Sequence, residues 1–186
     1  MVKQPFYYEM NWVIQAVLLL KFLAWIYINH WVQSSFPTVP LLSTADLATQ
    51  LSSTSGPPPV IIDTRTAEEY AVSHLPNAHH AETIEDIRTI LEDYENTTDL
   101  SQQTPLVLYC SIGYRSGRLV QKLMEEDVLA QTEGNYAAVN LKGSIFQWAN
   151  ENRPLVTDGQ STEQVHPYNR TRRHLLYPSV EPSFDP

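Results

Sequence analysis

The sequence predicts an α/β fold with a central parallel sheet of about five strands flanked by helices, and an additional hydrophobic helix at the N-terminus. Two patterns support this prediction. Short apolar runs alternate along the chain with segments in which apolar residues recur at helical spacing, which is typical of βαβ units. Several of the short runs are apolar throughout, as expected of parallel strands that are buried on both faces.

Composition limits the classes of function. The chain has 186 residues, 42% of them hydrophobic, which is enough for one domain with its own core and for additional segments. The formal net charge of −9 at pH 7 argues against a nucleic-acid partner. Cys110 is the only cysteine, so an internal disulfide framework is excluded.

The N-terminal helix is expected over residues 12–28, where Gln15 and Lys21 are the only polar residues. This apolar run lies near the lower limit of about 17 residues for a membrane-spanning helix. Aromatic residues near its ends suit a membrane interface, so we expect membrane attachment through residues 12–28, single-pass or interfacial. The alternative is an apolar helix packed against the domain, which Lys21 favours because charge is costly in the bilayer. A cleaved signal peptide fits poorly, since no small-residue cleavage site follows.

The next elements are placed by turn signals and apolar runs. A short strand is expected at 39–41 and a helix at 44–51, and residues 52–59 form a loop because they are rich in Ser, Gly and Pro. The run Val60–Asp63 predicts a strand that is buried on both faces.

A capping box marks the start of the next helix. Thr66 is followed three residues later by Glu69, a pair that satisfies two backbone N–H groups at a helix N-terminus. A short strand is expected at 78–81, and an acidic helix with an isoleucine-rich inner face is expected at 82–95.

The second half of the predicted sheet surrounds the cysteine. Residues 106–109 are a buried strand that runs into Cys110, and apolar residues recur at helical spacing over 116–126. A last strand at 137–141 and a helix at 144–150 follow. Cys110 therefore lies at the carboxyl edge of the sheet, where open α/β sheets place their sites.

The loop after Cys110 favours a thiolate. Loop N–H groups and a helix N-terminus stabilise an anion, and Arg115 adds a fixed positive charge. Asp63 and Arg65 end the adjacent strand and are expected to support the loop rather than to react. The alternative is a buried structural cysteine. No spaced set of ligands predicts a metal site.

Three segments resemble, in order, the signatures of the rhodanese family of sulfurtransferases. The segment Cys-Ser-Ile-Gly-Tyr-Arg-Ser at 110–116 resembles the active-site loop of that family. Residues 60–78 resemble its Asp-x-Arg…Glu-Phe/Tyr…Gly-His-Ile-Pro-Gly-Ala signature, and residues 140–155 resemble its closing Gly-Gly-x-x-x-Trp…Pro-Val segment. Ser73, Asn77 and Lys142 stand where glycines are usual.

The resemblance implies a rhodanese-like fold and a sulfurtransferase activity, with Cys110 as the nucleophile that becomes a persulfide. The substrates would be a small sulfur donor such as thiosulfate and a thiol or cyanide acceptor, with no cofactor. The residues expected to bind substrate are those of the loop: Ser111, Ile112, Gly113, Tyr114, Arg115 and Ser116.

Two other functions stay open. Phosphatases related to the rhodaneses carry one more residue between the cysteine and the arginine than the four found here, which makes phosphatase chemistry the weaker alternative. A membrane-tethered sensor or scaffold module without significant turnover is the second alternative, although such modules often lack the cysteine that this chain retains.

The expected organisation is an N-terminal segment at 1–36, a rhodanese-like domain at 37–157 and a polar, Pro-rich extension at 158–186. The three arginines between 170 and 173 could meet anionic lipid headgroups, or the extension could be loosely packed. The catalytic domain is expected on the cytoplasmic side, because persulfide chemistry depends on reduced thiols.

Overall fold

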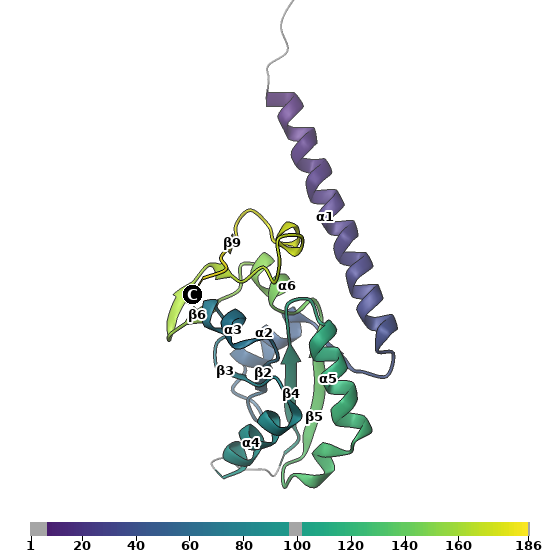
Figure 1. Ribbon diagram of the computed structural model, residues 1–186, viewed down its shortest axis with the longest axis vertical. Coiled ribbons are helices and arrows are strands. Elements are labelled where there is room, and N and C mark those ends of the chain that lie inside the picture. The colour runs from purple at the N-terminus through teal and green to yellow at the C-terminus, as the bar shows by residue number, and fades with distance from the viewer. Residues whose placement is uncertain (1–6, 97–101, 186) are drawn as a thin grey trace, which may run out of the picture.

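The computed structural model describes residues 7–96 and 102–185 and confirms the α/β fold (Figure 1). The central sheet has five strands in the order β1–β5–β4–β2–β3, and every pairing is parallel. The strands are β1 (Leu41–Leu42), β2 (Val60–Asp63), β3 (Ala78–His80), β4 (Thr104–Tyr109) and β5 (Tyr136–Leu141).

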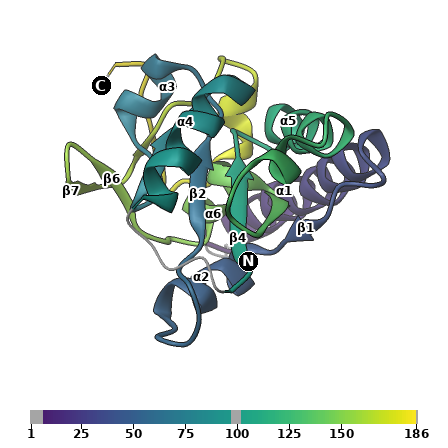
Figure 2. The same cartoon turned by 90° about the horizontal axis from the view of Figure 1, so that it is seen from below.

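The central strand β4 contributes to two hydrophobic cores, one on each face of the sheet. Val107 and Tyr109 face the core that contains side chains of α2 (Thr44–Ser52) and α6 (Ser144–Asn150). Leu106 and Leu108 face the core formed with α4 (Ile84–Glu95) and α5 (Tyr114–Glu125), and the two layers are visible in Figure 2. This alternation is the period-2 pattern of a strand that is buried on both faces.

Most element boundaries agree with the sequence to within one or two residues, and β2 and α6 agree completely. The helix α3 (Ala67–Val72) begins with the expected capping box of Thr66 and Glu69. The helix α5 begins at Tyr114, two residues before the expected start at Ser116. Gly113 adopts φ of +100°, so the chain turns directly from the loop into the helix before the apolar periodicity starts.

The helix α1 (Tyr7–Ser35) is longer than the expected 12–28 and has two different halves. From residue 12 to residue 20, every described side chain is exposed. In the second half, Trp25 and Val32 are buried against the domain, as is Phe36 just beyond the helix. Ile14–Ser35 is the one helical stretch in the described part of the chain that is long and apolar enough to cross a membrane.

The C-terminal extension forms short elements that pack on the domain. An antiparallel hairpin joins β6 (Leu155–Thr157) and β7 (Gln160–Thr162), and β8 (Gln164–Val165) pairs in parallel with β9 (Glu181–Pro182). A short helical turn, η2 (Arg172–Leu175), lies between β8 and β9 in the sequence. The other short turn, η1 (Val128–Gln131), belongs to the domain and lies between α5 and β5. Buried apolar residues fix the extension to the core: Val165, Leu176 and Val180.

Candidate active site

Cys110 begins the loop between β4 and α5, and its side chain is only 1% exposed. The backbone N–H of Gly113 donates a hydrogen bond to Cys110 Sγ at 3.2 Å. This contact requires the loop to fold back on itself, and the positive φ of Gly113 makes that turn possible at little cost. The loop therefore directs at least one backbone donor at the sulfur.

The N-terminus of α6 holds the first carbonyl groups of the loop. Ile145 N–H donates to the carbonyl of Cys110 and Phe146 N–H donates to the carbonyl of Ser111, both at 3.2 Å. The Ser144 hydroxyl accepts a hydrogen bond from the N–H of Cys110 at 3.1 Å. These bonds anchor the first two residues of the loop to the N-terminus of α6.

Asn140 at the end of β5 fixes the second half of the loop. Its Nδ2 donates to the carbonyl of Gly113 at 2.9 Å, and its Oδ1 accepts from the Ser116 hydroxyl at 2.7 Å. The side chain of Asn140 is 1% exposed, so both bonds lie in a dry environment where they hold the loop strongly. Sequence reasoning did not identify Asn140 as part of the site; its only signal was its place at the start of the third rhodanese-like segment.

Arg115 is held by a carboxylate from a distant helix. Its Nη1 donates to Glu69 Oε2 at 2.6 Å and its Nη2 donates to Glu69 Oε1 at 2.8 Å, while Nη2 also donates to Ser111 Oγ at 2.9 Å. Ser111 in turn donates to Glu69 Oε1 at 3.0 Å. Glu69 is the main residue that sequence reasoning missed: it was interpreted as a helix cap, although it is also the glutamate of the Asp-x-Arg…Glu-Phe/Tyr signature.

The environment of Cys110 lowers the pKa of its thiol. Burial alone raises that pKa, but the charge of Arg115 and the backbone hydrogen bonds of Ser116 and Ile112 outweigh burial. The Ser116 hydroxyl has a single proton, which it donates to Asn140, so the Ser116 backbone N–H is the better-placed donor. A thiolate is the reactive form of cysteine, so these contacts activate the sulfur.

Asp63 and Arg65 form a fully buried ion pair below the loop, with Arg65 Nη2 at 2.6 Å from Asp63 Oδ2. Arg65 also donates to the carbonyl of Ser73 and lies 5.9 Å from the ring centroid of Tyr109, the residue before Cys110. Between the two, Thr64 donates its N–H and its hydroxyl to the Tyr109 carbonyl. The pair therefore meets the site through Tyr109 and not through the loop residues themselves, and its supporting role stays a prediction.

Two of the expected binding residues direct their side chains elsewhere. Ile112 is buried in the hydrophobic core. The ring of Tyr114 stacks on Trp31 of α1, with centroids 4.8 Å apart and planes 5° from parallel. Around the sulfur itself lie the backbone N–H of Gly113, the backbones of Ile112 and Ser116 and the charge of Arg115, whereas the Ser111 hydroxyl binds Arg115.

The C-terminal extension also reaches this site. The Tyr168 ring centroid lies 5.1 Å from Arg115 Cζ and 4.5 Å from Arg172 Cζ, distances at which a cation is attracted to an aromatic ring. Arg115 reaches solvent, with 31% of its side chain exposed, and Tyr168 lies against it. The extension therefore contributes to the surroundings of the candidate active site, which the sequence did not predict.

Residues 44–151 match the protein family described as Rhodanese-like domain, which covers more than half of the chain. A search of curated proteins found no match. Among solved structures, the chain is similar to a rhodanese-like domain protein from Staphylococcus aureus, with 26% identity, coverage of 64% of this chain and 98% of that one, and a TM-score of 0.43. A rhodanese-related protein from Thermoplasma volcanium shares 21% identity, with coverage of 64% and 99% and a TM-score of 0.43.

A thiosulfate sulfurtransferase from Pseudomonas aeruginosa shares the fold at 20% identity and a TM-score of 0.51. The match covers 79% of this chain but only 25% of the P. aeruginosa protein, so the chain corresponds to about a quarter of that enzyme.

Proposed function

Since the chain belongs to the rhodanese-like domain family, we propose that it is a sulfurtransferase that carries a sulfane sulfur as a persulfide on Cys110. The observation that carries this proposal is the environment of the sulfur. Cys110 Sγ accepts the Gly113 N–H and has a lowered pKa, with the positive charge of Arg115 close by. Such a site is suited to a nucleophilic thiolate and to an anionic sulfur attached to it.

The first half-reaction transfers one sulfur atom to the enzyme. The Cys110 thiolate attacks the outer sulfur of thiosulfate and forms a new S–S bond. The S–S bond of thiosulfate breaks, and its electron pair leaves with sulfite. The product is a Cys110 persulfide that carries one negative charge, so atoms and charge balance without an external oxidant.

The second half-reaction restores the thiolate. Cyanide, or the thiolate of an acceptor, attacks the terminal sulfur, and the electron pair of the persulfide bond returns to Cys110 Sγ. Thiocyanate or an acceptor persulfide is released. In this sequence the loop N–H groups stabilise the terminal sulfur between the two steps, as oriented backbone donors stabilise other anions.

Arg115 has a narrower role than an unbound arginine would have. Its two Nη atoms already donate to the two carboxylate oxygens of Glu69. The pair of N–H groups that could bind a substrate anion in a bidentate manner is therefore occupied by a carboxylate of the protein itself. A donor anion would use the remaining N–H groups at Nε and Nη1. We propose that Glu69 and Ser111 hold Arg115 in place so that its charge stays beside the sulfur.

Steady-state transfer of sulfur from thiosulfate to cyanide tests this function. The wild-type protein should form thiocyanate with ping-pong kinetics, and Cys110→Ala should form none while it keeps the wild-type unfolding midpoint. Full activity in Cys110→Ala, or no turnover in the wild type with any thiol or cyanide acceptor, would reject the enzyme and favour the sensor or scaffold alternative. Cys110-dependent hydrolysis of an aryl phosphate would favour the phosphatase alternative.

We also propose that α1 attaches the protein to a membrane, with the catalytic domain outside the bilayer on the cytoplasmic side. The exposed first half of α1 supports this attachment. A cleaved signal is the competing role, but cleavage after α1 would remove Trp25 and Val32 from the core. Full-length protein should sediment with membranes and be released by detergent, and deletion of residues 1–20 should make it soluble. Recovery of the full-length protein without detergent would reject the anchor.

A further inference from the structure

The helix α1 leaves the domain at Lys21. The Lys21 ammonium group donates to the carbonyl of Leu176 and lies 5.4 Å from the ring centroid of Tyr177, both in the C-terminal extension. Before this point α1 projects from the body of the protein (Figure 1), and the side chains of Trp12 and Leu20 are 62% and 65% exposed. Lys21 therefore marks where a free apolar helix becomes a helix that packs on protein.

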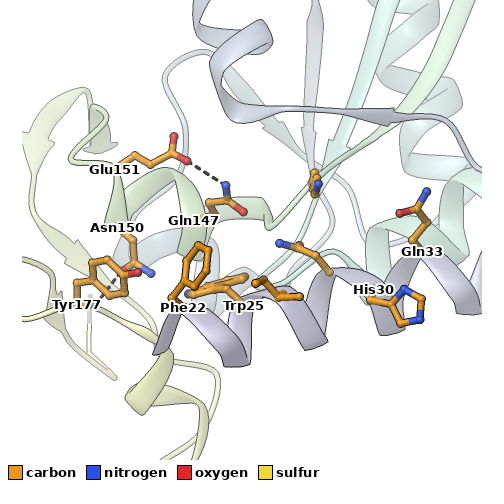
Figure 3. Close-up of a pocket in the computed structure, with 11 residues that line it drawn as sticks. Phe22, Trp25, His30, Gln33, Gln147, Asn150, Glu151 and Tyr177 are labelled. Carbon is orange, nitrogen blue, oxygen red and sulfur yellow. Dashed lines mark hydrogen bonds between the residues drawn. The ribbon is translucent and has the colours of Figure 1, made fainter. Parts of the chain in front are cut away.

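Beyond Lys21, polar groups lie along α1. A cavity of about 400 Å³ lies between this part of α1 and α6, and Figure 3 shows around it His30 and Gln33 on α1, Gln147 on α6 and Glu151 just after α6. Polar and ionisable groups of this kind are costly in hydrocarbon. The polar lining of this cavity is consequently suited to water or to lipid headgroups, and the apolar stretch before Lys21 to the hydrocarbon, although Leu23 and Tyr27 beyond Lys21 are also exposed, by 51% and 70%.

A basic cluster surrounds the same point. Lys21, Arg173 and His174 line one hollow of about 310 Å³, and Arg173 and His174 also line a second hollow with Arg170. Arg170, Arg173 and His174 are exposed. In the described part of the chain, none of the four has an ion pair with an acidic residue. These four residues, called the basic cluster below, stand out against the net charge of −9.

We propose that the basic cluster binds the anionic headgroups of the membrane that α1 enters. The apolar half of α1 would lie in the hydrocarbon, and headgroup phosphates would contact Lys21, Arg170 and Arg173 at its base. This inference rests on the proposed membrane attachment and not on the sulfur chemistry. Basic residues beside a membrane helix contribute in this way through their attraction to anionic lipid.

The basic cluster lies close in the chain to a residue that contacts the cysteine loop. Tyr168 is two residues before Arg170, and its ring lies against Arg115 of the cysteine loop. A membrane bound at the basic cluster would therefore lie beside the surface through which Arg115 reaches solvent. Donors and acceptors would approach Cys110 close to the headgroup layer.

Flotation of the full-length protein with lipid vesicles tests the proposal. Vesicles of phosphatidylcholine alone are compared with vesicles that contain about 30 mol% of an anionic phospholipid. This proportion gives the vesicle surface a strong negative potential. The wild type should bind the anionic vesicles more tightly, and added salt should reduce the difference because it screens charge.

Two double variants distinguish the effect of the basic cluster on vesicle binding from the effect of the protein's net charge. Arg170→Gln combined with Arg173→Gln should reduce the preference for anionic vesicles roughly 25-fold, about fivefold per arginine. The matched control, Arg118→Gln with Lys122→Gln, removes two exposed cations of α5 and should keep the preference. Equal binding of the wild type to both vesicles, or equal losses in the two double variants, would overturn the proposal. Absence of binding to either vesicle would reject the anchor itself.

Discussion

The carboxylate of Glu69 accepts hydrogen bonds from both Nη atoms of Arg115, at 2.6 and 2.8 Å, across 46 residues of sequence. Glu69 belongs to α3 and Arg115 to the first turn of α5, so this contact ties two helices together beside Cys110. The side chain of Glu69 is 4% exposed, and an ion pair that is largely removed from water is sensitive to the loss of either partner.

Removal of the Glu69 carboxylate should impair sulfur transfer without affecting Cys110 directly. In Glu69→Ala the guanidinium loses its bidentate partner and moves away from its position beside the sulfur. We expect kcat/KM for thiosulfate to fall by on the order of tenfold to a hundredfold. Glu68→Ala changes the neighbouring, exposed residue of the same helix and should leave kcat/KM unchanged. Equal activity of the two variants would refute the positioning role of Glu69.

Replacement of Arg115 should separate the effect of its charge from the effect of its geometry. Lysine keeps the charge but cannot bind Glu69 and Ser111 with a planar group. For Arg115→Lys we expect kcat/KM for thiosulfate to fall by on the order of tenfold, as for a lost charged hydrogen bond. Wild-type kcat/KM in this variant would show that charge alone is sufficient.

The alkylation rate of Cys110 should report its lowered pKa. The rate constant for alkylation by iodoacetamide follows the fraction of Cys110 that is thiolate. The pH at which this rate constant is half-maximal should therefore lie below the pKa of about 8.5 of an ordinary thiol. Arg115 lowers this pKa, so the midpoint should rise in Arg115→Gln and shift less in Arg115→Lys. A midpoint that does not move in Arg115→Gln would contradict the assigned cause.

Acid should destabilise the protein partly through Glu69. Burial raises the pKa of Glu69, but its bonds and charge interaction with Arg115 lower the pKa overall. A lowered folded pKa contributes stability above the unfolded value of about 4.3, and this contribution is lost as pH falls through the folded pKa. Urea unfolding between pH 7 and pH 3 should therefore show a smaller loss of stability in Glu69→Gln than in the wild type. Parallel pH profiles for the two proteins would refute this linkage.

Gly117 of α5 should be required for the close packing of Phe36, just after α1, and of Asn140 of β5. A Cβ at Gly117 would lie 2.8 Å from Phe36 Cδ2 and 3.0 Å from Asn140 Nδ2. Gly117→Ala should reduce the free energy of unfolding by about 1–3 kcal/mol, the usual cost of overpacking. The control Arg118→Ala is on the exposed face of the same helix and should be nearly neutral. An unchanged unfolding free energy in Gly117→Ala would show that Phe36 is free to move aside.

The sequence predicted the sheet and the position of the cysteine because both depend on local patterns. Val60–Asp63 and Leu106–Tyr109 are apolar runs whose length and turn signals indicate strands. Asn77 stands where a glycine is usual, and its φ of +59° is in the region that Asn adopts more readily than most residues.

The rest of the site depends on tertiary contacts. Glu69 has a local role as part of a helix cap, which accounts for its position in the sequence without the long-range contact with Arg115 that the structure shows. Asn140 and Ser144 act through hydrogen bonds to a loop from another part of the chain. The extension was difficult to predict because β8 and β9 have only two residues each, too few for a periodic pattern.

The central claim is that Cys110 carries sulfur as a persulfide. The most direct measurement is the intact mass of the full-length protein after incubation with thiosulfate and removal of excess donor. The wild type should gain the mass of one sulfur atom, lose it again on addition of cyanide, and Cys110→Ala should gain nothing. An unchanged wild-type mass, or the same gain in Cys110→Ala, would contradict the account.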